Sequence, residues 1–340
     1  MSIPFSDIRK QVGTLQVAER FFDSLLLFTL FDLGIFRHLA AGPRGLEELA
    51  QAVGGHTSTL RAVLDASVAT GLLQVEESGQ YTAQTELMAC LADEHAPAYL
   101  GEWVAFLGTL VAPVSDLAQT VRTGRPSASL REGSEYDNRP ARAMTAAMDA
   151  YARTRGLELA HRLDMEGVGT LLDIGCGPGT YSLALLKQHP ALHAILLDLP
   201  GPIAEASEYV AASGLGERVT LAAADAFDYE PEREVDLILV SNILHMLGSE
   251  GSQALLARCG ELVRPGGRLV VQAQFLNPER TAPRWPTLLN LIMQGTTEGG
   301  RNHGLDETEQ WMQAAGFGQI EHQPLSPWNV NSLLVGVRKP

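Results

Sequence analysis

The stretch Thr170-Leu-Leu-Asp-Ile-Gly-Cys-Gly-Pro-Gly-Thr180 decides the fold of this chain. Apolar residues and one acid, Asp173, lead directly into three closely spaced glycines, which is typical of a buried parallel strand that ends in a ligand-binding loop. Apolar residues at helical spacing follow as far as Lys187. Strand, glycine loop and helix together predict the first unit of a nucleotide-binding α/β sheet.

Four more apolar segments predict further strands of this sheet. Ala194–Asp198 ends in an acid 23 residues after Gly175, which is where Rossmann-type sites hold a ribose diol. The other three segments are residues 219–225, which end in Asp225, residues 235–241 and residues 267–273. The predicted fold class is therefore α/β, with a Rossmann-like sheet.

These motifs resemble the class I methyltransferases, which use S-adenosylmethionine (SAM). The resemblance rests on the loop 173–179, the acid Asp198, the Ala-Ala-Asp ending at Asp225 and the stretch Leu-Val-Arg-Pro-Gly-Gly-Arg-Leu at 262–269. The loop reads G-x-G-x-G, whereas nicotinamide dehydrogenases have G-x-G-x-x-G. The whole chain is similar to plant-type and bacterial small-molecule O-methyltransferases, which carry an N-terminal winged-helix dimerisation domain. That family also closes its sheet with an antiparallel pair, here residues 320–325 and 332–337.

The resemblance implies a SAM site at the ends of these strands. The glycines would lie against the methionine end of SAM with Asp173 beneath, Asp198 would bind both ribose hydroxyls, and Asp225 would meet the adenine. Either of the last two acids could instead serve only in a turn or as a helix cap. The cofactor-binding residues that we expect are Asp173, Gly175, Gly177, Gly179, Asp198, Leu199, Asp225, Ala226, Phe227, Ser241 and Asn242.

We expect His245 to be the catalytic base that removes the proton of an acceptor hydroxyl. It follows the strand 235–241, at the edge where open α/β sheets bind ligands. An ordinary imidazole pKa of about 6.5 is appropriate for proton removal near neutral pH. His245 also matches the histidine of the family's His-Asp-Trp motif, which is the base in the plant enzymes. The alternative is a histidine that is buried or caps the next helix.

The acids that surround this histidine in the family are absent here. Met246 and Leu247 replace the Asp and Trp of the motif, and Gln274 and Asn302 fall where two glutamates are expected. A carboxylate would fix the tautomer and stabilise the imidazolium, whereas amides can orient a ring but carry no charge. Ser241 stands where the family has a lysine. The sequence therefore predicts either an acidic acceptor, such as a phenol, or a reaction in which deprotonation is easy.

The segment from Val17 to Ala41 predicts an unusually apolar helix. Aromatic and aliphatic residues occupy nearly every face of it, so we expect a partner chain to bury it in a homodimer. Asp23 and Asp32 interrupt the apolar run, which is too short to span a bilayer. Residues 1–16 would form a short arm.

Helical and strand patterns between residues 42 and 82 predict a winged helix. Helical stretches over 42–54 and 57–71, the second capped by Thr57, precede two short strands around 76–79. A winged helix can bind DNA, but Arg61 is the one cation that the second helix offers to phosphates and bases. We therefore expect dimerisation, and no nucleic acid as a partner.

Residues 93–165 are predicted to be mostly helical. Trp103, Met144 and Met148 are candidate walls of a flat acceptor pocket together with Gln274 and Asn302, although core packing is the more common role of methionines at such positions. Residues 295–304 are rich in glycine and predict a flexible lip, followed by a helix capped by Asp306. The predicted domains are 1–92 for dimerisation, 93–165 as helical linker and pocket wall, and 166–340 for SAM binding.

Composition restricts the partners and the compartment. The chain has 340 residues, which is long enough for two domains. Its net charge of −15 disfavours nucleic acid as a partner. Cys90, Cys176 and Cys259 show no metal-ligand spacing and indicate a reducing compartment. Without a signal-peptide pattern at the N-terminus, we expect a cytoplasmic enzyme with no membrane partner.

The sequence leaves several functions to be weighed. The first is a SAM-dependent O-methyltransferase that acts on a small, aromatic, hydroxylated metabolite of secondary metabolism. The same SAM site could serve C- or N-methylation or a reaction without methyl transfer, which the missing acids keep open. A winged-helix, ligand-responsive regulator is opposed by the acidic charge, and a nicotinamide dehydrogenase by the spacing of the glycines.

Overall fold

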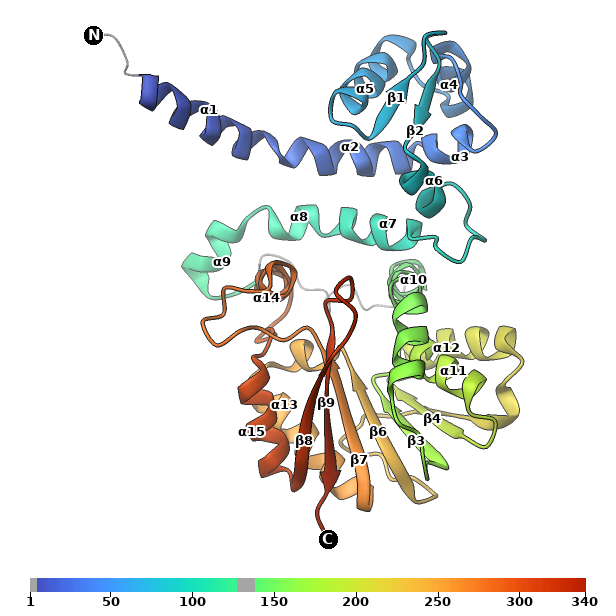
Figure 1. The fold of residues 1–340 in the computed structure, drawn as a ribbon, viewed down its shortest axis with the longest axis vertical. Coiled ribbons are helices and arrows are strands. Elements are labelled where there is room, and N and C mark those ends of the chain that lie inside the picture. The colour runs from blue at the N-terminus through green and yellow to red at the C-terminus, as the bar shows by residue number, and fades with distance from the viewer. Residues whose placement is uncertain (1–4, 127–137) are drawn as a thin grey trace. The chain divides into compact units, whose positions relative to one another are not determined.

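The computed structural model describes residues 5–126 and 138–340 and divides into two compact units (Figure 1). The first unit spans Met1–Gly108 and the second Thr109–Pro340. Each unit has a hydrophobic core of its own, so each is described separately.

The first unit is mostly helical. Its elements are α1 (Phe5–Glu19), α2 (Phe21–Asp32), α3 (Ile35–Leu39), α4 (Leu46–Val53), α5 (Thr57–Ala69), β1 (Leu73–Val75), β2 (Tyr81–Ala83), α6 (Thr85–Leu91) and most of α7 (Gly101–Thr109). Strands β1 and β2 pair antiparallel, with Leu73 opposite Ala83. The order α4, α5, β1, β2 is that of a winged helix, and Leu30, Phe36, Leu49 and Leu64 form its buried centre.

Three details of this unit differ from the prediction. The expected helix from Val17 to Ala41 is broken, because α2 ends at Asp32 and Gly34 takes a left-handed φ of 66°. The arm expected before residue 17 is helical in its described part, as α1. The prediction that Thr57 caps α5 was wrong, because His56 occupies the cap position and the Thr57 hydroxyl donates to Glu47 instead.

The second unit is a seven-stranded sheet between two layers of helices (Figure 1). The strands are β3 (Thr170–Ile174), β4 (His193–Asp198), β5 (Val219–Ala223), β6 (Val235–Ser241), β7 (Val263–Ala273), β8 (Phe317–Pro324) and β9 (Ser332–Arg338), in the spatial order β5-β4-β3-β6-β7-β9-β8. β3 to β7 run parallel, and β9 is antiparallel to both β7 and β8. The helices are α8 (Val111–Val114), α9 (Leu117–Thr123), α10 (Asn138–Arg162), α11 (Thr180–Gln188), α12 (Pro200–Ser213), α13 (Leu244–Leu262), α14 (Arg284–Thr296) and α15 (Leu305–Ala314), with a short 3₁₀ helix at Gly216–Arg218.

Alternation along the strands builds the two cores of this sheet. Leu172 and Ile174 point into the core shared with α13 and α15, whereas Leu171 points into the core shared with α10, α11 and α12. All three side chains are almost fully buried, because a central parallel strand is covered on both faces. The predicted Rossmann-like sheet is confirmed, and the carboxyl ends of β3 to β7 meet at one edge.

Two boundaries in this unit differ from the prediction. β7 starts at Val263 rather than at Gly267, with a shift in its pairing to β6 between Val235 and Leu237. The prediction that Asp306 caps α15 was wrong, because Gly304 is at the cap position and its N–H donates to Glu307 Oε1 at 2.6 Å. Within the segment 93–165, which the sequence predicts to be mostly helical, residues 127–137 lie outside the described residues.

Within residues 5–126 and 138–340, no single helix has both the length and the apolar character needed to cross a membrane. One bent pair, Gly101–Val114 with Leu117–Thr123, meets those criteria only when the two parts are taken together across a 53° bend.

Candidate active site

Pairing between the parallel strands brings the predicted cofactor residues to one edge of the sheet. Ile174 pairs with Val240, Asp198 with Ala223, and Ser241 with Gln272, so the loops after β3, β4, β5 and β6 are neighbours. This is the carboxyl edge, where open α/β sheets bind ligands.

The glycine loop after β3 has a tightly defined backbone. Gly175, Gly177 and Gly179 all have positive φ, between 52° and 75°. A Cβ on Gly175 would overlap Ile243, and one on Gly179 would lie 2.7 Å from Leu196. A Cβ on Gly177 would meet nothing within 4 Å, so the chain leaves open space on that side of the loop.

Asp173 lies buried at the end of β3, just before the loop. Ser182, at the start of α11, donates its hydroxyl to Asp173 Oδ2 at 2.6 Å. Burial raises the pKa of Asp173 to about 7, with a smaller upward contribution from Asp198, while the Ser182 hydrogen bond opposes the shift. The free chain therefore holds a partly protonated acid beneath the glycine loop.

Asp198 ties the end of β4 to the glycine loop. Its Oδ2 accepts the Gly177 N–H at 2.9 Å and its Oδ1 accepts the Leu199 N–H at 2.8 Å. Burial raises the pKa of Asp198, although both backbone hydrogen bonds lower it. Each carboxylate oxygen can accept two hydrogen bonds, so each keeps one lone-pair site for a ligand hydroxyl.

Beyond Asp198, two large apolar side chains are exposed along the same edge. Leu199 is 52% exposed after β4, and Phe227 is 43% exposed after β5. The exposed Asp225 accepts the Phe227 N–H at 3.0 Å, so it does form a local turn, while Ala226 packs on the core. Two exposed apolar side chains that flank an acid provide a surface on which a flat heterocycle can stack.

Ser241 and Asn242 close the other side of the loop. Asn242 has a positive φ of 54°, which is rare for a residue other than glycine, and its N–H donates to the Gln272 carbonyl at 2.8 Å. Its buried Oδ1 has no partner within the described residues, while the Ser241 hydroxyl accepts from Gln272 Nε2 at 3.0 Å. An orphaned acceptor, an open glycine side and a carboxylate with free lone pairs fit a nucleoside cofactor with hydroxyl and amino groups.

His245 lies in the first turn of α13, three residues after Asn242. Its side chain is partly exposed, and among the described residues neither ring nitrogen has a hydrogen-bond partner. Burial of the ring, and then the charge of His303, lower the pKa of His245 to about 4. The imidazole is therefore neutral at physiological pH and able to accept a proton.

The two amides in the places of the family's glutamates do not hydrogen-bond to His245. Gln274 Nε2 donates to the Tyr151 hydroxyl at 3.0 Å, and its buried Oε1 has no partner among the described residues. Asn302 Nδ2 donates to the carbonyl oxygens of Gln274 and Pro286, at 2.6 and 3.0 Å. Both amides thus join the end of β7 to its surroundings, and the side-chain Oε1 of Gln274 remains available to a ligand.

The remaining candidate pocket residues belong to different units. Trp103 is in α7 of the first unit, with its ring 5.6 Å from that of Phe106. Met144 and Met148 are one turn apart on α10 of the second unit, and Met144 is 38% exposed. Neither methionine belongs to the buried core, so core packing does not account for them.

Two polar groups near the site carried no signal in the sequence. Asp149 on α10 is buried, accepts the Thr180 hydroxyl at 2.6 Å and pairs with Arg153, which fixes α10 against the start of α11. His303 is buried beside the His245 segment, with its Nε2 3.1 Å from the Leu244 carbonyl oxygen. Both contacts join residues more than 30 positions apart, so no local pattern could reveal them.

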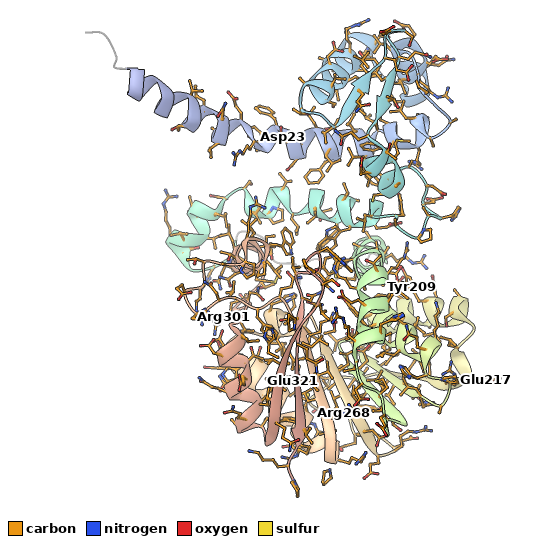
Figure 2. All side chains as sticks on the ribbon, viewed as in Figure 1. Asp23, Tyr209, Glu217, Arg268, Arg301 and Glu321 are labelled. Carbon is orange, nitrogen blue, oxygen red and sulfur yellow. The ribbon has the colours of Figure 1, made fainter. Side chains whose placement is uncertain are left out.

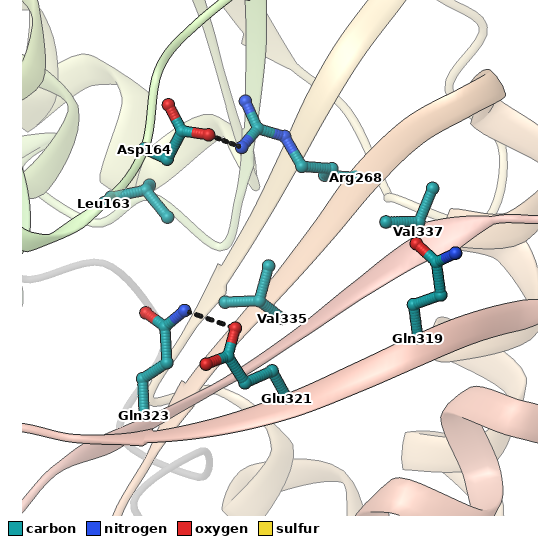
Figure 3. A pocket seen from close by; sticks show the side chains of 8 residues that line it. All are labelled: Leu163, Asp164, Arg268, Gln319, Glu321, Gln323, Val335 and Val337. Atoms are coloured by element: carbon teal, nitrogen blue, oxygen red, sulfur yellow. Dashed lines mark hydrogen bonds and ion pairs between the residues drawn. The ribbon is translucent and has the colours of Figure 1, made fainter.

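A separate hollow of about 390 Å³ lies away from this edge (Figure 3). Its walls include Arg268 near the start of the paired part of β7 and Asp164 before β3, which form an ion pair at 3.3 Å. Both residues are at the amino ends of the parallel strands, so the hollow is not part of the candidate active site. Within the described residues, no group of three or more His, Cys, Asp or Glu is placed to hold a metal ion.

Comparison with known proteins identifies the family. Models of the O-methyltransferase domain and the O-methyltransferase dimerisation domain match residues 115–318 and 15–92. The chain is 30% identical to the tetracenomycin polyketide synthesis 8-O-methyl transferase TcmO of Streptomyces glaucescens, over 99% of both chains. It is 29% identical to the 3-hydroxy-5-methyl-1-naphthoate 3-O-methyltransferase of Streptomyces sahachiroi, over 92% of this chain and 91% of that one. The crystal structure of human N-acetylserotonin methyltransferase in complex with SAM shares the fold, with a TM-score of 0.88 at 21% identity over 99% of this chain and 100% of that one. This chain therefore belongs to the O-methyltransferase family of S-adenosylmethionine-dependent enzymes.

Proposed function

We propose that this enzyme methylates a phenolic hydroxyl of a small, polyketide-type aromatic metabolite. The observation that carries the proposal is His245, a neutral imidazole at the carboxyl edge of the sheet that has no carboxylate partner among the described residues. An imidazole whose pKa is about 4 is a weak base, so it is suited to a hydroxyl that is already acidic, such as a phenol conjugated to a carbonyl group. The names of TcmO and the naphthoate enzyme describe methylation in polyketide synthesis and on a hydroxynaphthoate, which supports this acceptor class.

The residues of the glycine loop would hold the donor. SAM, when bound, supplies a methyl group on a positively charged sulfur that is a good leaving group. Gly177 leaves room for the methionine end, and Asp173 lies beneath the loop. Asp198 would accept both ribose hydroxyls through its free lone pairs, while Leu199 and Phe227 cover the adenine and Asp225 accepts from its amino group.

The acceptor would lie on the side of His245 and Gln274. Methyl transfer is an in-line displacement, so the protein has to hold the acceptor oxygen about 3 Å from the methyl carbon. The side-chain Oε1 of Gln274 can accept a hydrogen bond from a polar group of the acceptor. Met144 and Met148 would supply apolar contacts to a flat ring, and Asn302 Nδ2 holds Gln274 in place through the Gln274 backbone carbonyl. His245 takes the hydroxyl proton as the oxygen attacks.

The first unit supports a homodimer. The described residues of α1 and α2 expose Leu15, Phe21 and Phe22, each more than half accessible, next to Val12, Val17 and Leu25. The dimerisation-domain match begins at residue 15 and so covers most of this surface. A second copy of the chain would bury it, as the apolar pattern of the sequence predicts.

The remaining expectations follow from this assignment. We assign dimerisation to residues 1–92, the helical link and pocket wall to 93–165, and SAM binding to 166–340. The scattered cysteines, all free in the structure, favour a cytoplasmic location.

The decisive test is methyl transfer to a defined phenol. Purified enzyme with ¹³C-methyl SAM and 3-hydroxy-5-methyl-1-naphthoate should give a product whose labelled carbon is bonded to oxygen by NMR. The matched control is 5-methyl-1-naphthoate, which lacks the hydroxyl and should gain no label. Label on carbon or nitrogen, or equal labelling of the control, would contradict the proposal.

A further inference from the structure

The segment that carries His245 is packed against residues 295–304. A Cβ on Gly300 would lie 2.9 Å from the His245 carbonyl oxygen, and one on Gly248 would lie 2.5 Å from the Gly299 carbonyl oxygen. Gly248 has φ 65° and ψ −171°, so the first turn of α13 is separated from the rest of the helix by a kink. Thr297 and Asn302, in the same stretch of chain as Gly299 and Gly300, are buried. Residues 295–304 thus form a packed support for His245, in place of the flexible lip that the glycines predict.

His303 makes the central contact of this support. It is 3% exposed, and its Nε2 is 3.1 Å from both the Leu244 carbonyl oxygen and Ser252 Oγ. Leu244 precedes His245 directly, so His303 contacts the carbonyl group of the peptide bond between Leu244 and His245. The fully buried Ser252 donates its hydroxyl to the same Leu244 oxygen at 3.0 Å.

These contacts determine the tautomer of His303. The Leu244 oxygen can only accept, and the Ser252 hydroxyl already points its hydrogen at that oxygen. Nε2 of His303 must therefore carry a hydrogen. An unprotonated Nε2 would face the Leu244 carbonyl oxygen and Ser252 Oγ with no hydrogen to share with either. The ring also meets the edge of Trp311, with centroids 4.9 Å apart at 76°, which restricts its rotation.

Charged groups fix the backbone on either side of His303. Glu307 accepts the Gly304 N–H at 2.6 Å, and Arg301, in the segment just before α15 (Figure 2), pairs with Glu307 at 2.7 Å. Arg301 Nε also donates to Ser249 Oγ at 2.8 Å, so it reaches the far end of the His245 segment. His303 is thus held from both sides while its Nε2–H stays directed at Leu244.

From this geometry we infer that His303 is a positioning residue for His245, acting through the Leu244 carbonyl and Ser252. The inference rests on the proposed base role of His245. In the family pattern, carboxylates orient the imidazole ring of the base directly. In this chain, the described residues 295–304 fix the backbone that precedes His245 and make no hydrogen bond to its ring nitrogens. His303 contacts neither donor nor acceptor in this scheme, so its effect is on the placement of the base.

Variants that separate the Nε2–H donor from the ring test the inference. His303→Gln keeps an amide donor near the position of Nε2, whereas His303→Phe keeps the ring beside Trp311 and removes the donor. His303→Asn has a donor that is too short to reach Leu244, so it serves as a second donor-less variant if the Phe variant does not fold. Hydrogen–deuterium exchange read by mass spectrometry reports the backbone of residues 243–249 without any acceptor present.

We expect exchange of residues 243–249 to become at least tenfold faster in His303→Phe or His303→Asn, and to stay within threefold of wild type in His303→Gln. Exchange at residues 171–179 and affinity for S-adenosylhomocysteine should change less than twofold in all three. Exchange at 243–249 as slow as in wild type for the donor-less variants, or as fast in His303→Gln as in His303→Phe, would overturn the inference. A base role for His245 is tested separately by His245→Ala, so the two can fail independently.

Discussion

The loop after β3 and the segment after β6 lie at the same edge of one sheet but are held in different ways. The glycine loop is fixed by the end of the next strand in the chain, since Gly175 donates to the Leu197 carbonyl at 2.8 Å and Gly177 to Asp198, both at the end of β4. The His245 segment is fixed by His303 and Arg301, which come more than 50 residues later in the chain. Donor binding thus depends on contacts between two consecutive strands, and placement of the base on contacts to residues more than 50 positions later.

This difference explains why the two halves of the site depart unequally from the family pattern. A glycine loop can work only with glycines at positive φ and an acid at the end of the next strand, so its sequence is restricted. A catalytic base can be positioned by contacts to its ring or to its backbone. Gln274 and Asn302 can therefore replace the family's glutamates while His303 and Arg301 position the His245 segment. The predictions below test each half of the site.

The largest effect is expected at the base. His245→Ala should lower kcat at least 100-fold with a phenolic acceptor, because removal of the proton then falls to water. Its affinity for S-adenosylhomocysteine, measured by calorimetry, should stay within threefold of wild type. A decrease in kcat below about tenfold would show that His245 is not the base.

Next in size is the loss of the ribose contacts. Asp198→Ala should weaken S-adenosylhomocysteine binding roughly 100-fold, because two hydrogen bonds to a charged group are lost. Asp198→Asn, which keeps one acceptor oxygen, should weaken it about tenfold. Calorimetry that gives equal affinities for wild type and Asp198→Ala would refute the ribose role.

A smaller effect is expected in the pH dependence. The pKa of His245 is lowered to about 4, and only its neutral form can accept a proton, so activity is lost as pH falls through about 4. Between pH 5 and pH 7, kcat/KM should therefore change less than about twofold, measured in a buffer of constant ionic strength. An acid limb centred near pH 6.5 would mean that the base has an ordinary pKa, and it would contradict the lowered pKa of His245.

Two glycines of the loop provide a matched pair with still smaller effects. Both alanine substitutions strain a left-handed residue by about 1 kcal/mol or more, but only the Gly179 Cβ also collides with the fully buried Leu196. Gly179→Ala should therefore unfold at a lower temperature than Gly177→Ala. Gly177→Ala, whose Cβ points into the open space, should instead show about tenfold weaker S-adenosylhomocysteine binding. Calorimetric scans and titrations of both variants decide the order.

The smallest effect concerns Asp173. Its pKa is raised to about 7 in the folded chain, so the folded state retains a proton that the unfolded state releases near pH 4. The stabilisation of the folded state by the protonated Asp173 is complete below about pH 4, and it is lost as the pH rises through about 7. Asp173→Asn keeps the Ser182 hydrogen bond but does not titrate, so its melting temperature relative to wild type should rise between pH 5 and pH 8. A constant difference over that range would contradict the shift.

The sheet and the donor half of the site could be predicted because their signals are local. Buried parallel strands read as apolar runs, and the loop shows as glycines next to an acid. Helix starts were predicted less well: Thr57 and Asp306 have side chains typical of caps, but His56 and Gly304 occupy the cap positions. The role of His303 could not be predicted, because Ser252 and Leu244 lie 51 and 59 residues away and only the packed fold brings them together.

The central claim is that the end of β3 and the end of β4 together bind the methyl donor. A crystal structure of the enzyme with S-adenosylhomocysteine tests it most directly. We predict that both ribose hydroxyls lie about 3 Å from the carboxylate of Asp198, with the adenine between Leu199 and Phe227. A nucleoside found elsewhere on the chain, or a ribose without contact to Asp198, would contradict the account.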